Sequence, residues 1–474
     1  MKTISRRDFV RISAAGAAVA AAPRYLHAVS DSSPAGSISV WTTAGDKRHA
    51  ASEALQWKPG PGSANNTITV DKSRQFQEVL GFGAAFTDAA CFTLSRLDTA
   101  VRHQLFGALF DPRQMGLSVS RVCIGASDYS RELYSYDDSK EPDPELKQFS
   151  IERDRAYILP ILREARAMNP DLWLLASPWS PPGWMKSNDS MLGGSMRKTW
   201  YATYAQYLQR FVEAYDGEGV RINSITTQNE VDTDQDGRMP ACLWGQEYEI
   251  EFVRDHLGPR LAESKNSPDI WILDHNYNLW GRVLCELEDE KARQYIKGVA
   301  WHGYAGAPDA MSRVQSAYPR IGQFWTEGGP DFVQPGYATE WTKWGDQFTG
   351  ILRNWARCII AWNYALDENG KPNIGPFQCA GLLTVDSKTA SISYSGQYWA
   401  MAHFSSHIRR GAKITESTGK LNDIRHVAAV NPSGESVLVL TNTGKQSRKV
   451  HIQSGDSGVE IILLADSVST LVWS

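Results

Sequence analysis

Two glutamates, Glu230 and Glu327, each follow a run of apolar and β-branched residues typical of a strand. Glu230 ends INSITTQNE, and Glu327 lies in IGQFWTEGG. A retaining glycosidase uses two such carboxylates, one as general acid and base and one as a nucleophile about 5 Å away. The sequence therefore predicts a sugar-cleaving site, provided that the fold brings the two glutamates together.

Three aspartates follow Glu230 at alternate positions, and DTDQDG (Asp232 to Gly237) matches the first six positions of a calcium-binding loop. The twelfth position is Leu243, where such a loop needs a bidentate glutamate. We therefore expect an exposed loop beside the active site and no metal.

Two other kinds of site are weakly supported. GFGAAF has two glycines of a dinucleotide-binding fingerprint, but Phe86 replaces the third, and a close-packed first strand explains the segment better. No GxSxG motif is present to place a nucleophilic serine. We expect no cofactor.

The two glutamates need a scaffold, and eight apolar runs separated by helix-period segments supply one: VLGFGAAFTD, LSVSRVCIG, LWLLASPWS, INSITTQNE, IWILDHN, GVAWHGYA, IGQFWTEGG and CIIAWNYAL. Strands that alternate with helices form parallel βαβ units, and eight such units fit a closed (β/α)8 barrel. The pattern predicts a TIM barrel over residues 76–389. Glu230 would then end the fourth strand and Glu327 the seventh, at the face where barrel active sites lie.

The segments before and after the barrel have the alternating hydrophobic pattern of strands, without helix-period segments between them. Residues 390–474 contain short alternating strands separated by turn signals, and residues 37–75 contain strand patterns without helical partners. We expect the two segments to form one accessory antiparallel β-sandwich domain.

Residues 1–28 resemble a twin-arginine export signal, with Arg6 and Arg7 before an apolar run of small residues and with Ala22 or Ala28 as the cleavage site. The alternative is an anchored helix, but the run has about a dozen residues against the roughly 20 that span a bilayer. We expect a periplasmic or secreted protein with no stable membrane insertion. Removal of the segment changes the formal net charge from -4 to -8, which argues against nucleic acid as a partner. The six cysteines show no CxxC spacing and are expected to be mostly buried thiols; no signal for an oligomeric state is present.

Six ordered blocks resemble the motifs of glycoside hydrolase family 30, the glucosylceramidase-like enzymes: GFGAAFTDAACFTLSRL, SRVCIGASDYS, SPWSPPGWMKSN, ITTQNE, FWTEGGP and HFSSHIRRG. The resemblance runs from about Ser37 to the C-terminus. It implies a barrel with a side β-domain built from both ends of the chain, and a retaining β-glycosidase. In many members a proline follows the QNE glutamate, whereas here Val231 begins a different loop where the aglycone would sit, which weighs against a lipid-linked aglycone.

The resemblance also assigns roles. Glu230 would be the general acid and base, Glu327 the nucleophile, and Asn229 would bind the sugar 2-hydroxyl. Asp128 and Trp179 match positions that hold hydroxyls and close over the ring, Trp362 would floor the pocket, and Arg121, His302 and Tyr304 would orient the glutamates. Arg121 is equally compatible with a buried ion pair, and His302 with a core position.

The resulting hypothesis is a retaining, exo-acting β-glycosidase of the β-glucosidase or glucosylceramidase type. The alternatives within the family are β-1,6-glucanase, β-xylosidase and β-fucosidase. A non-catalytic sugar-binding barrel would be expected to lack one glutamate, and both are present.

Overall fold

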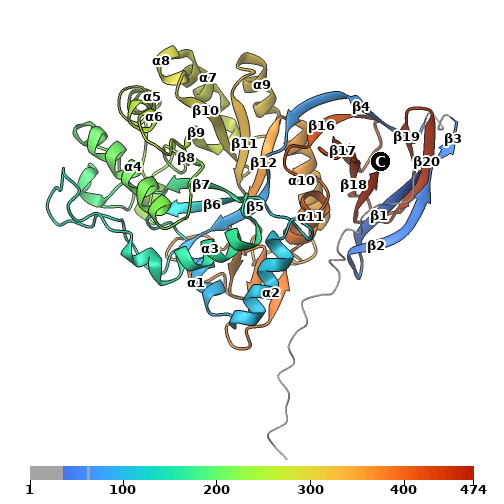
Figure 1. The fold of residues 1–474 in the computed structure, drawn as a ribbon, viewed down its shortest axis with the longest axis horizontal. Helices are drawn as coiled ribbons and strands as arrows, with labels where there is room; N and C mark the ends of the chain where they lie inside the picture. The colour runs from blue at the N-terminus through green and yellow to red at the C-terminus, as the bar shows by residue number, and fades with distance from the viewer. Residues whose placement is uncertain (1–35, 61–64) are drawn as a thin grey trace, which may run out of the picture.

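The computed structural model describes residues 36–60 and 65–474, which form a barrel and a β-rich domain (Figure 1). The predicted signal peptide, residues 1–28, lies outside the described residues. Within the described ranges, no helix has the length and apolar character that crossing a bilayer requires.

Eight parallel strands close into the barrel in the order in which they follow one another along the chain. Each of the eight apolar runs overlaps one of these strands, so the predicted TIM barrel is confirmed. The strands are β5 (Gly81–Phe86), β6 (Val119–Ile124), β7 (Trp173–Pro178), β8 (Ser224–Thr226), β9 (Asp269–Asn276), β10 (Ile296–His302), β11 (Gly322–Glu327) and β12 (Ala356–Ala361).

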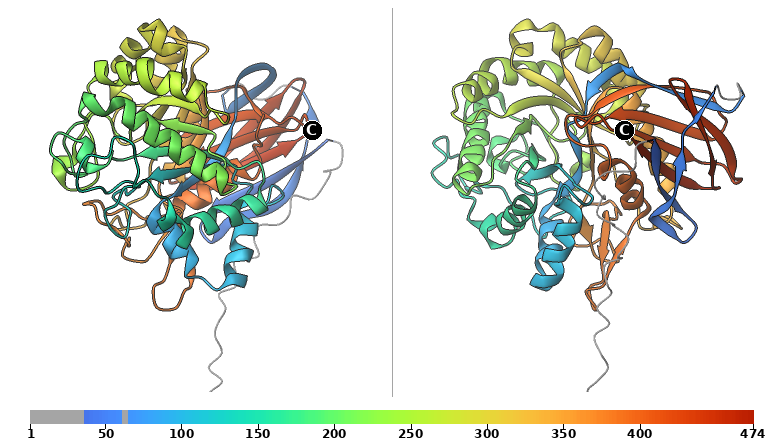
Figure 2. Two further views of the ribbon diagram at one scale, coloured as in Figure 1. Left: turned by 60° about the vertical axis from the view of Figure 1, so that its left-hand side comes forward. Right: turned by 45° about the vertical axis from the view of Figure 1, so that its right-hand side comes forward.

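Helices follow the strands and cover the outside of the barrel (Figure 2). They are α1 (Asp88–Ser95), α2 (Thr99–Phe110), α3 (Ile158–Met168), α4 (Tyr201–Gly217), α5 (Gln246–Phe252), α6 (Gly258–Ala262), α7 (Trp280–Glu288), α8 (Glu290–Arg293), α9 (Asp309–Ala317), α10 (Trp341–Arg353) and α11 (Gly396–Ser405). The 3-10 turns are η1 (Glu152–Ala156), η2 (Gly183–Met185), η3 (Lys198–Trp200), η4 (Gln235–Gly237) and η6 (Tyr277–Leu279), and η5 (Val253–Leu257) is a π-helical segment between α5 and α6. Side-chain caps start the first two helices, because Thr87 accepts from the N–H of Ala90 and Asp98 from that of Ala100.

Every second residue of a strand points into the barrel, and these inward residues form an apolar layer and a polar layer at different heights. The apolar layer consists of Leu80, Val119, Leu175, Trp271, Ala300, Phe324, Cys358 and Ile360. The rings of Trp271 and Phe324 stack with centroids 3.7 Å apart. Nearer the strand ends lie buried polar side chains, namely Arg121, Ser177, Thr226, Asp274, His302 and Thr326. The barrel is thus packed solid at one end and carries a polar network at the other.

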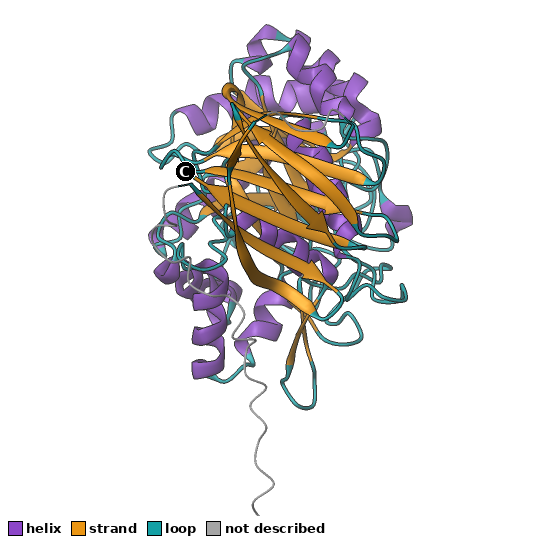
Figure 3. Ribbon diagram, turned by 90° about the vertical axis from the view of Figure 1, so that its right-hand side faces the viewer, coloured by secondary structure: helices purple, strands orange, loops and turns teal. Residues whose placement is uncertain are grey.

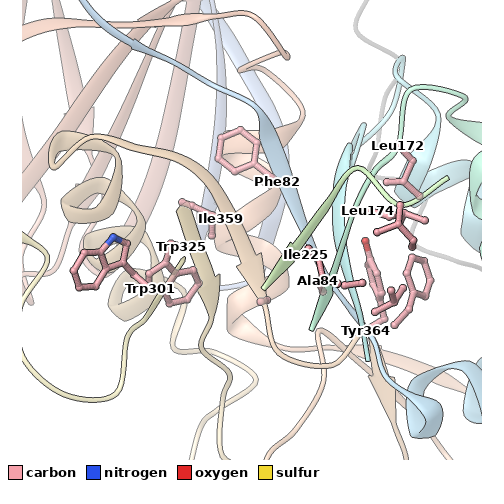
Figure 4. Packing of buried hydrophobic residues seen from close by; sticks show 14 of the residues in the cluster. Phe82, Ala84, Leu172, Leu174, Ile225, Trp301, Trp325, Ile359 and Tyr364 are labelled. Atoms are coloured by element: carbon pink, nitrogen blue, oxygen red, sulfur yellow. The ribbon is translucent and has the colours of Figure 1, made fainter. Parts of the chain in front are cut away.

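A larger apolar core surrounds the strands, part of which Figure 4 shows. Ile225, Trp301, Trp325 and Ile359 contribute to it from four strands and are fully buried. Burial of one such side chain contributes about 1.5–3 kcal/mol. This packing holds the strand ends, and with them the polar network, in place.

The β-domain is a ten-stranded sheet in the order β2-β1-β21-β18-β17-β16-β4-β19-β20-β3 (Figure 3). Its strands are β1 (Ser37–Ala44), β2 (Lys47–Gln56), β3 (Lys58–Pro59), β4 (Thr67–Glu78), β16 (Lys413–Thr418), β17 (Ile424–Val430), β18 (Ser436–Asn442), β19 (Arg448–Ser454), β20 (Ser457–Leu463) and β21 (Ser467–Trp473). The two ends of the chain interleave, because β1 pairs with β21 and β4 lies between β16 and β19. The expected sandwich from both termini is confirmed.

The β-domain packs on the barrel through α10 and α11 (Figure 1). Ile38, Ile68, Leu438, Ile452 and Leu471 belong to the core inside the domain. Val437, Val439, Val468 and Val472 instead join the core of the barrel helices. Side chains that alternate along β18 and β21 therefore point either into the core of the β-domain or toward the barrel helices.

The boundary between the two domains differs from the expected residue 390. Residues 390–412 include β15 (Ile392–Tyr394) and α11, and the first sandwich strand after the barrel, β16, begins at Lys413. β15 forms a small sheet with β13 (Ala365–Leu366) and β14 (Leu383–Val385) in the connection from β12 to α11. The segment Ile392–Tyr394 therefore pairs with β14 and does not join the sandwich. At the other end, β4 continues to Glu78, past the expected residue 75.

All six cysteines lie among the described residues and are free thiols. Four are buried, Cys379 is half-buried and Cys285 is exposed. The expectation of mostly buried thiols is confirmed.

Candidate active site

A cavity of about 410 Å³ opens where the barrel strands end, and both predicted catalytic glutamates line it. Catalytic groups in this fold come from the ends of several strands, which converge at this face. The lining residues are Asp128, Trp179, Asn229, Glu230, Thr233, Gln235, Met239, His275, Asn276, Tyr304, Glu327, Trp362, Phe377 and Cys379.

Glu327 is the last residue of β11 and is buried. Its carboxylate accepts hydrogen bonds from the Arg121 guanidinium and from the Tyr304 hydroxyl, the latter at 3.1 Å. Burial raises the pKa of Glu327 above its ordinary value, and the positive charges of His302 and Arg121 oppose that rise. Both hydrogen-bond donors favour the ionised form, which is the form a carboxylate nucleophile needs.

Arg121, from β6, is fully buried behind the cavity wall. Its Nη2 donates to Asn229 Oδ1 and to Asp274 Oδ2, both at 2.6 Å. The guanidinium carbon lies 4.6 Å from the centroid of the Trp179 ring, within cation–π range. Arg121 therefore ties the nucleophile to three neighbouring groups without lining the cavity.

Asp274 is the centre of the buried network and was not predicted. Its carboxylate accepts from Arg121, from His302 Nε2 at 3.1 Å, and from Thr226 Oγ1 and Thr326 Oγ1, each at 2.8 Å. Burial would raise the pKa of Asp274, but the Arg121 charge and the hydrogen bond from His302 hold it well below its ordinary value. Asp274 is thus an anion that pairs with Arg121 and His302.

A β-bulge points Asp274 into the barrel. Leu273 and Asp274 have φ of 73° and 45°, and the pairing of β9 with β10 skips Asp274, since Ala300 lies opposite Leu273 and Trp301 opposite His275. Trp271 faces the interior, so simple alternation would direct Leu273 inward and Asp274 outward. The bulge reverses this, and it also turns the Asp274 carbonyl toward Glu230.

A buried glutamate on α5 clamps the bulge from outside the barrel. Glu249 Oε1 accepts from the Leu273 N–H at 3.2 Å and from the Thr227 hydroxyl, while Oε2 accepts from Arg282 Nη2 at 2.7 Å. Arg282, on α7, also pairs with Glu286 at 2.6 Å. Glu249 therefore links the strained backbone at Leu273 to the segment that leads into Glu230.

Glu230 lies four residues beyond the end of β8, with a φ of 54°. Its Oε2 accepts from Gln235 Nε2 at 2.8 Å, and its Oε1 lies 3.3 Å from His302 Nδ1 and 3.7 Å from His275 Nδ1. Burial raises the pKa of Glu230, but the hydrogen bond from His302 and the charges of His275 and His302 outweigh it, and the pKa falls below its ordinary value.

His302 connects the two glutamates. Besides Glu230 and Asp274, its ring contacts Glu327, with Nε2 and Oε2 3.8 Å apart. Burial lowers the pKa of His302, but the charge of Glu327 and the hydrogen bonds to Asp274 and Glu230 outweigh it and raise the pKa to about 9. His302 therefore holds a proton within reach of Glu230 at neutral pH.

The remaining walls suit a sugar ring. Trp179 and Trp362 stack with centroids 5.2 Å apart, and their apolar faces match the apolar face of a pyranose. Burial and the charges of Glu327 and Glu230 raise the pKa of Asp128 well above its ordinary value. This favours the protonated carboxyl, which can both donate to and accept from hydroxyls. Because the Asn229 amide oxygen accepts from Arg121, its NH₂ group is the part left to meet a substrate hydroxyl.

All nine residues selected from the sequence meet at this site. Seven line the cavity, whereas Arg121 and His302 lie buried behind it and contact the glutamates. Gln235, His275 and Asp274 also belong to the site and were not among the predicted residues. His275 and Asp274 could have been noticed in the sequence, because they are ionisable residues inside the otherwise apolar strand IWILDHN.

The DTDQDG loop follows Glu230 and contributes Thr233 and Gln235 to the cavity. Asp234 Oδ1 accepts from the Asp236 N–H at 3.1 Å, and Asp236 pairs with Arg238 at 3.4 Å. Asp234 and Asp236 thus serve the loop's own turn, and Thr233 and Gln235 are the loop residues that line the cavity.

Comparisons with known proteins agree with this geometry. Residues 79–408 match the glycosyl hydrolase family 30 TIM-barrel domain, and residues 411–471 match the family's beta sandwich domain. The chain is 32% identical to the endo-1,6-beta-D-glucanase of Neurospora crassa over 87% of each chain, and 32% identical to putative glucosylceramidase 4 of Caenorhabditis elegans over 80% of this chain and 77% of that one. A solved endo-β-1,6-glucanase superposes with a TM-score of 0.85 at 28% identity, covering 92% of this chain and 99% of that one.

Proposed function

Because the chain belongs to glycosyl hydrolase family 30 and is a glycoside hydrolase, we propose that it cleaves β-1,6-linked glucans with retention of configuration. The name endo-1,6-glucanase occurs both among its sequence relatives and among the solved structures it resembles. These relatives support the alternative raised from the sequence better than the expected exo-acting, glucosylceramidase-type enzyme. The Neurospora crassa glucanase matches over 87% of each chain, whereas putative glucosylceramidase 4 matches over 80% of this chain and 77% of that one, and the lysosomal acid glucosylceramidase of Mus musculus is 27% identical.

The observation that carries this choice is the hydrogen bond from Gln235 to Glu230, at 2.8 Å. Glu230 would protonate the departing oxygen, so groups beside it face the leaving group. Gln235 comes from a loop that also contains three aspartates and Arg238. A polar loop at this position fits a leaving sugar with hydroxyl groups and does not fit a ceramide chain.

In the first step, Glu327 attacks the anomeric carbon while Glu230 gives its proton to the leaving oxygen. His302 Nδ1 lies 3.3 Å from Glu230 and supplies that proton as the substrate displaces water from the cavity. Arg121 and Tyr304 hold the Glu327 carboxylate in line, and Asn229 presents its NH₂ group to the 2-hydroxyl, where hydrogen bonding strengthens in the transition state.

In the second step, Glu230 is a carboxylate and takes a proton from water, which attacks the glycosyl-enzyme and releases Glu327. The proton returns to the Glu230–His302 pair. The site then regains the charge distribution from which it started.

The test is a substrate panel at matched concentrations: a linear β-1,6-glucan, a linear β-1,3-glucan, glucosylceramide in detergent, and aryl β-glucoside, β-xyloside and β-fucoside. We expect the highest kcat/KM on the β-1,6-glucan. Oligosaccharides as early products would indicate endo cleavage, whereas glucose alone would indicate exo cleavage. Faster turnover of glucosylceramide, xyloside or fucoside than of the β-1,6-glucan would overturn the proposed substrate.

We also propose export by the twin-arginine route, on the evidence of Arg6 and Arg7. Replacing both with lysine should leave the precursor inside the cell, as measured by fractionation and blotting. The matched control is Arg11→Lys, which should be exported normally. Normal export of the Arg6→Lys/Arg7→Lys variant would overturn the proposal.

A further inference from the structure

Three potential metal ligands converge at the acid and base glutamate. Glu230 Oε1 lies 3.3 Å from His302 Nδ1 and 3.7 Å from His275 Nδ1. All three ligand atoms lie within 4.8 Å of one another, and within the described part of the chain this is the single group of its kind.

The His275 side chain is an unsatisfied polar group at this point. It is 8% exposed, and its Nδ1 has no hydrogen-bond partner. A buried polar atom without a partner costs about 1–3 kcal/mol, and a ligand bound beside it would remove that cost. Nδ1 is directed toward Glu230, at the wall of the cavity, where a bound ion would satisfy it.

The spacing fits a tetrahedral ion. Zn²⁺ binds imidazole nitrogen and carboxylate oxygen at about 2.0–2.2 Å, so two ligands at the tetrahedral angle lie roughly 3.3–3.6 Å apart. The separation of 3.3 Å lies within this range and that of 3.7 Å lies just above it. The two histidine nitrogens lie within 4.8 Å of each other, so the His275 and His302 rings would have to move closer together around an ion. The cavity leaves the fourth position open to water.

The surroundings complete such a site. Asp274 Oδ1 lies 3.1 Å from His302 Nε2, which is the carboxylate–histidine arrangement that orients an imidazole ligand through its other nitrogen. The two charges of the ion, together with that of Arg121, would balance the carboxylates of Glu230, Asp274 and Glu327. No buried charge would then be left uncompensated.

We propose that Glu230, His275 and His302 form an inhibitory binding site for a divalent transition-metal ion of the Zn²⁺ type. The ion would occupy the carboxylate that must protonate the leaving group, so binding of the ion and turnover exclude each other. The inhibitory part of this proposal rests on the catalytic role proposed for Glu230, whereas ion binding does not.

The test is isothermal titration of ZnCl₂ into metal-free protein, with inhibition of an aryl glycoside measured in parallel. We expect one ion per chain and competitive inhibition. Mg²⁺ should not bind, because it prefers oxygen ligands in octahedral geometry. His275→Gln should weaken Zn²⁺ binding at least tenfold, and His103→Gln, at an exposed position on α2, should bind like wild type.

Glu230→Gln provides a second ligand variant should His275→Gln fold poorly, as judged by its melting temperature. Absence of binding, or unchanged binding in both ligand variants, would overturn the metal site. Zn²⁺ binding that depends on His275 but leaves turnover unaffected would uphold the metal site and overturn the catalytic role of Glu230.

Discussion

The backbone N–H of Glu230 donates a hydrogen bond to the carbonyl oxygen of Asp274 at 2.9 Å. The side chain of the same aspartate binds Arg121 and His302, which contact Glu327. One bulged residue of β9 therefore anchors the acid and base glutamate through its backbone and the nucleophile through its side chain. The relative placement of the two glutamates depends on a strand that contains neither.

Glu230→Ala should act according to the leaving group. Substrates with poor leaving groups should lose about 10²- to 10⁴-fold in kcat/KM, since acid catalysis contributes that much. Activated aryl glycosides need little protonation, so the glycosyl-enzyme should accumulate, and azide should release it as the β-glycosyl azide. Burst kinetics and NMR of the azide product measure both effects. An α-glycosyl azide would contradict the assignment.

Glu327→Gly should abolish the covalent intermediate whatever the leaving group, because no nucleophile remains. Azide should then attack the substrate directly and yield the α-glycosyl azide. Mass spectrometry of the protein after incubation with an activated 2-fluoro glycoside should show a covalent adduct in wild type and none in the variant. Near-normal turnover of activated substrates would show that Glu327 is not the nucleophile.

Glu249→Gln tests whether the clamp outside the barrel positions Glu230. Weakening its contacts with Leu273, Thr227 and Arg282 should shift the bulge and reduce kcat on poor leaving groups about ten- to a hundredfold, with KM little changed. Activated aryl glycosides should be much less affected. Glu247→Gln, at an exposed site on the same helix, is the control. An equal loss on both classes of substrate, with a lower melting temperature, would indicate a merely structural role.

His302 should make stability fall at alkaline pH. Its pKa in the folded protein is raised from 6.5 to about 9, so the stabilisation is fully present below pH 6.5 and is lost as the pH rises to about 9. The loss corresponds to about 3 kcal/mol. Urea unfolding at pH 6 and pH 9.5 measures this loss of stability. Because other ionisable groups titrate in both proteins, the difference between wild type and His302→Gln gives the contribution of His302 alone. An equal pH dependence in the two proteins would refute the assigned pKa.

Local sequence patterns were sufficient to predict the barrel and most of the residues that line its cavity. The strands are short apolar runs with the strand period, and their C-terminal ends must converge once the barrel closes. Glu230, Glu327, Asp128, Trp179, Asn229, Tyr304 and Trp362 all lie at or just after such ends, so their assembly follows from the chain order. The family motifs then distinguished the glutamates from the neighbouring aspartates of the DTDQDG loop.

Asp274, His275, Gln235 and Glu249 owe their roles to the tertiary structure. A strand of period two would direct Asp274 away from the interior, and only the register of β9 against β10 creates the bulge that reverses it. Glu249 belongs to a helix outside the barrel and reaches Leu273 only because α5 packs there. Patterns along a sequence specify which face a residue shares with its neighbours, whereas bulges and contacts between elements depend on partners distant in the chain.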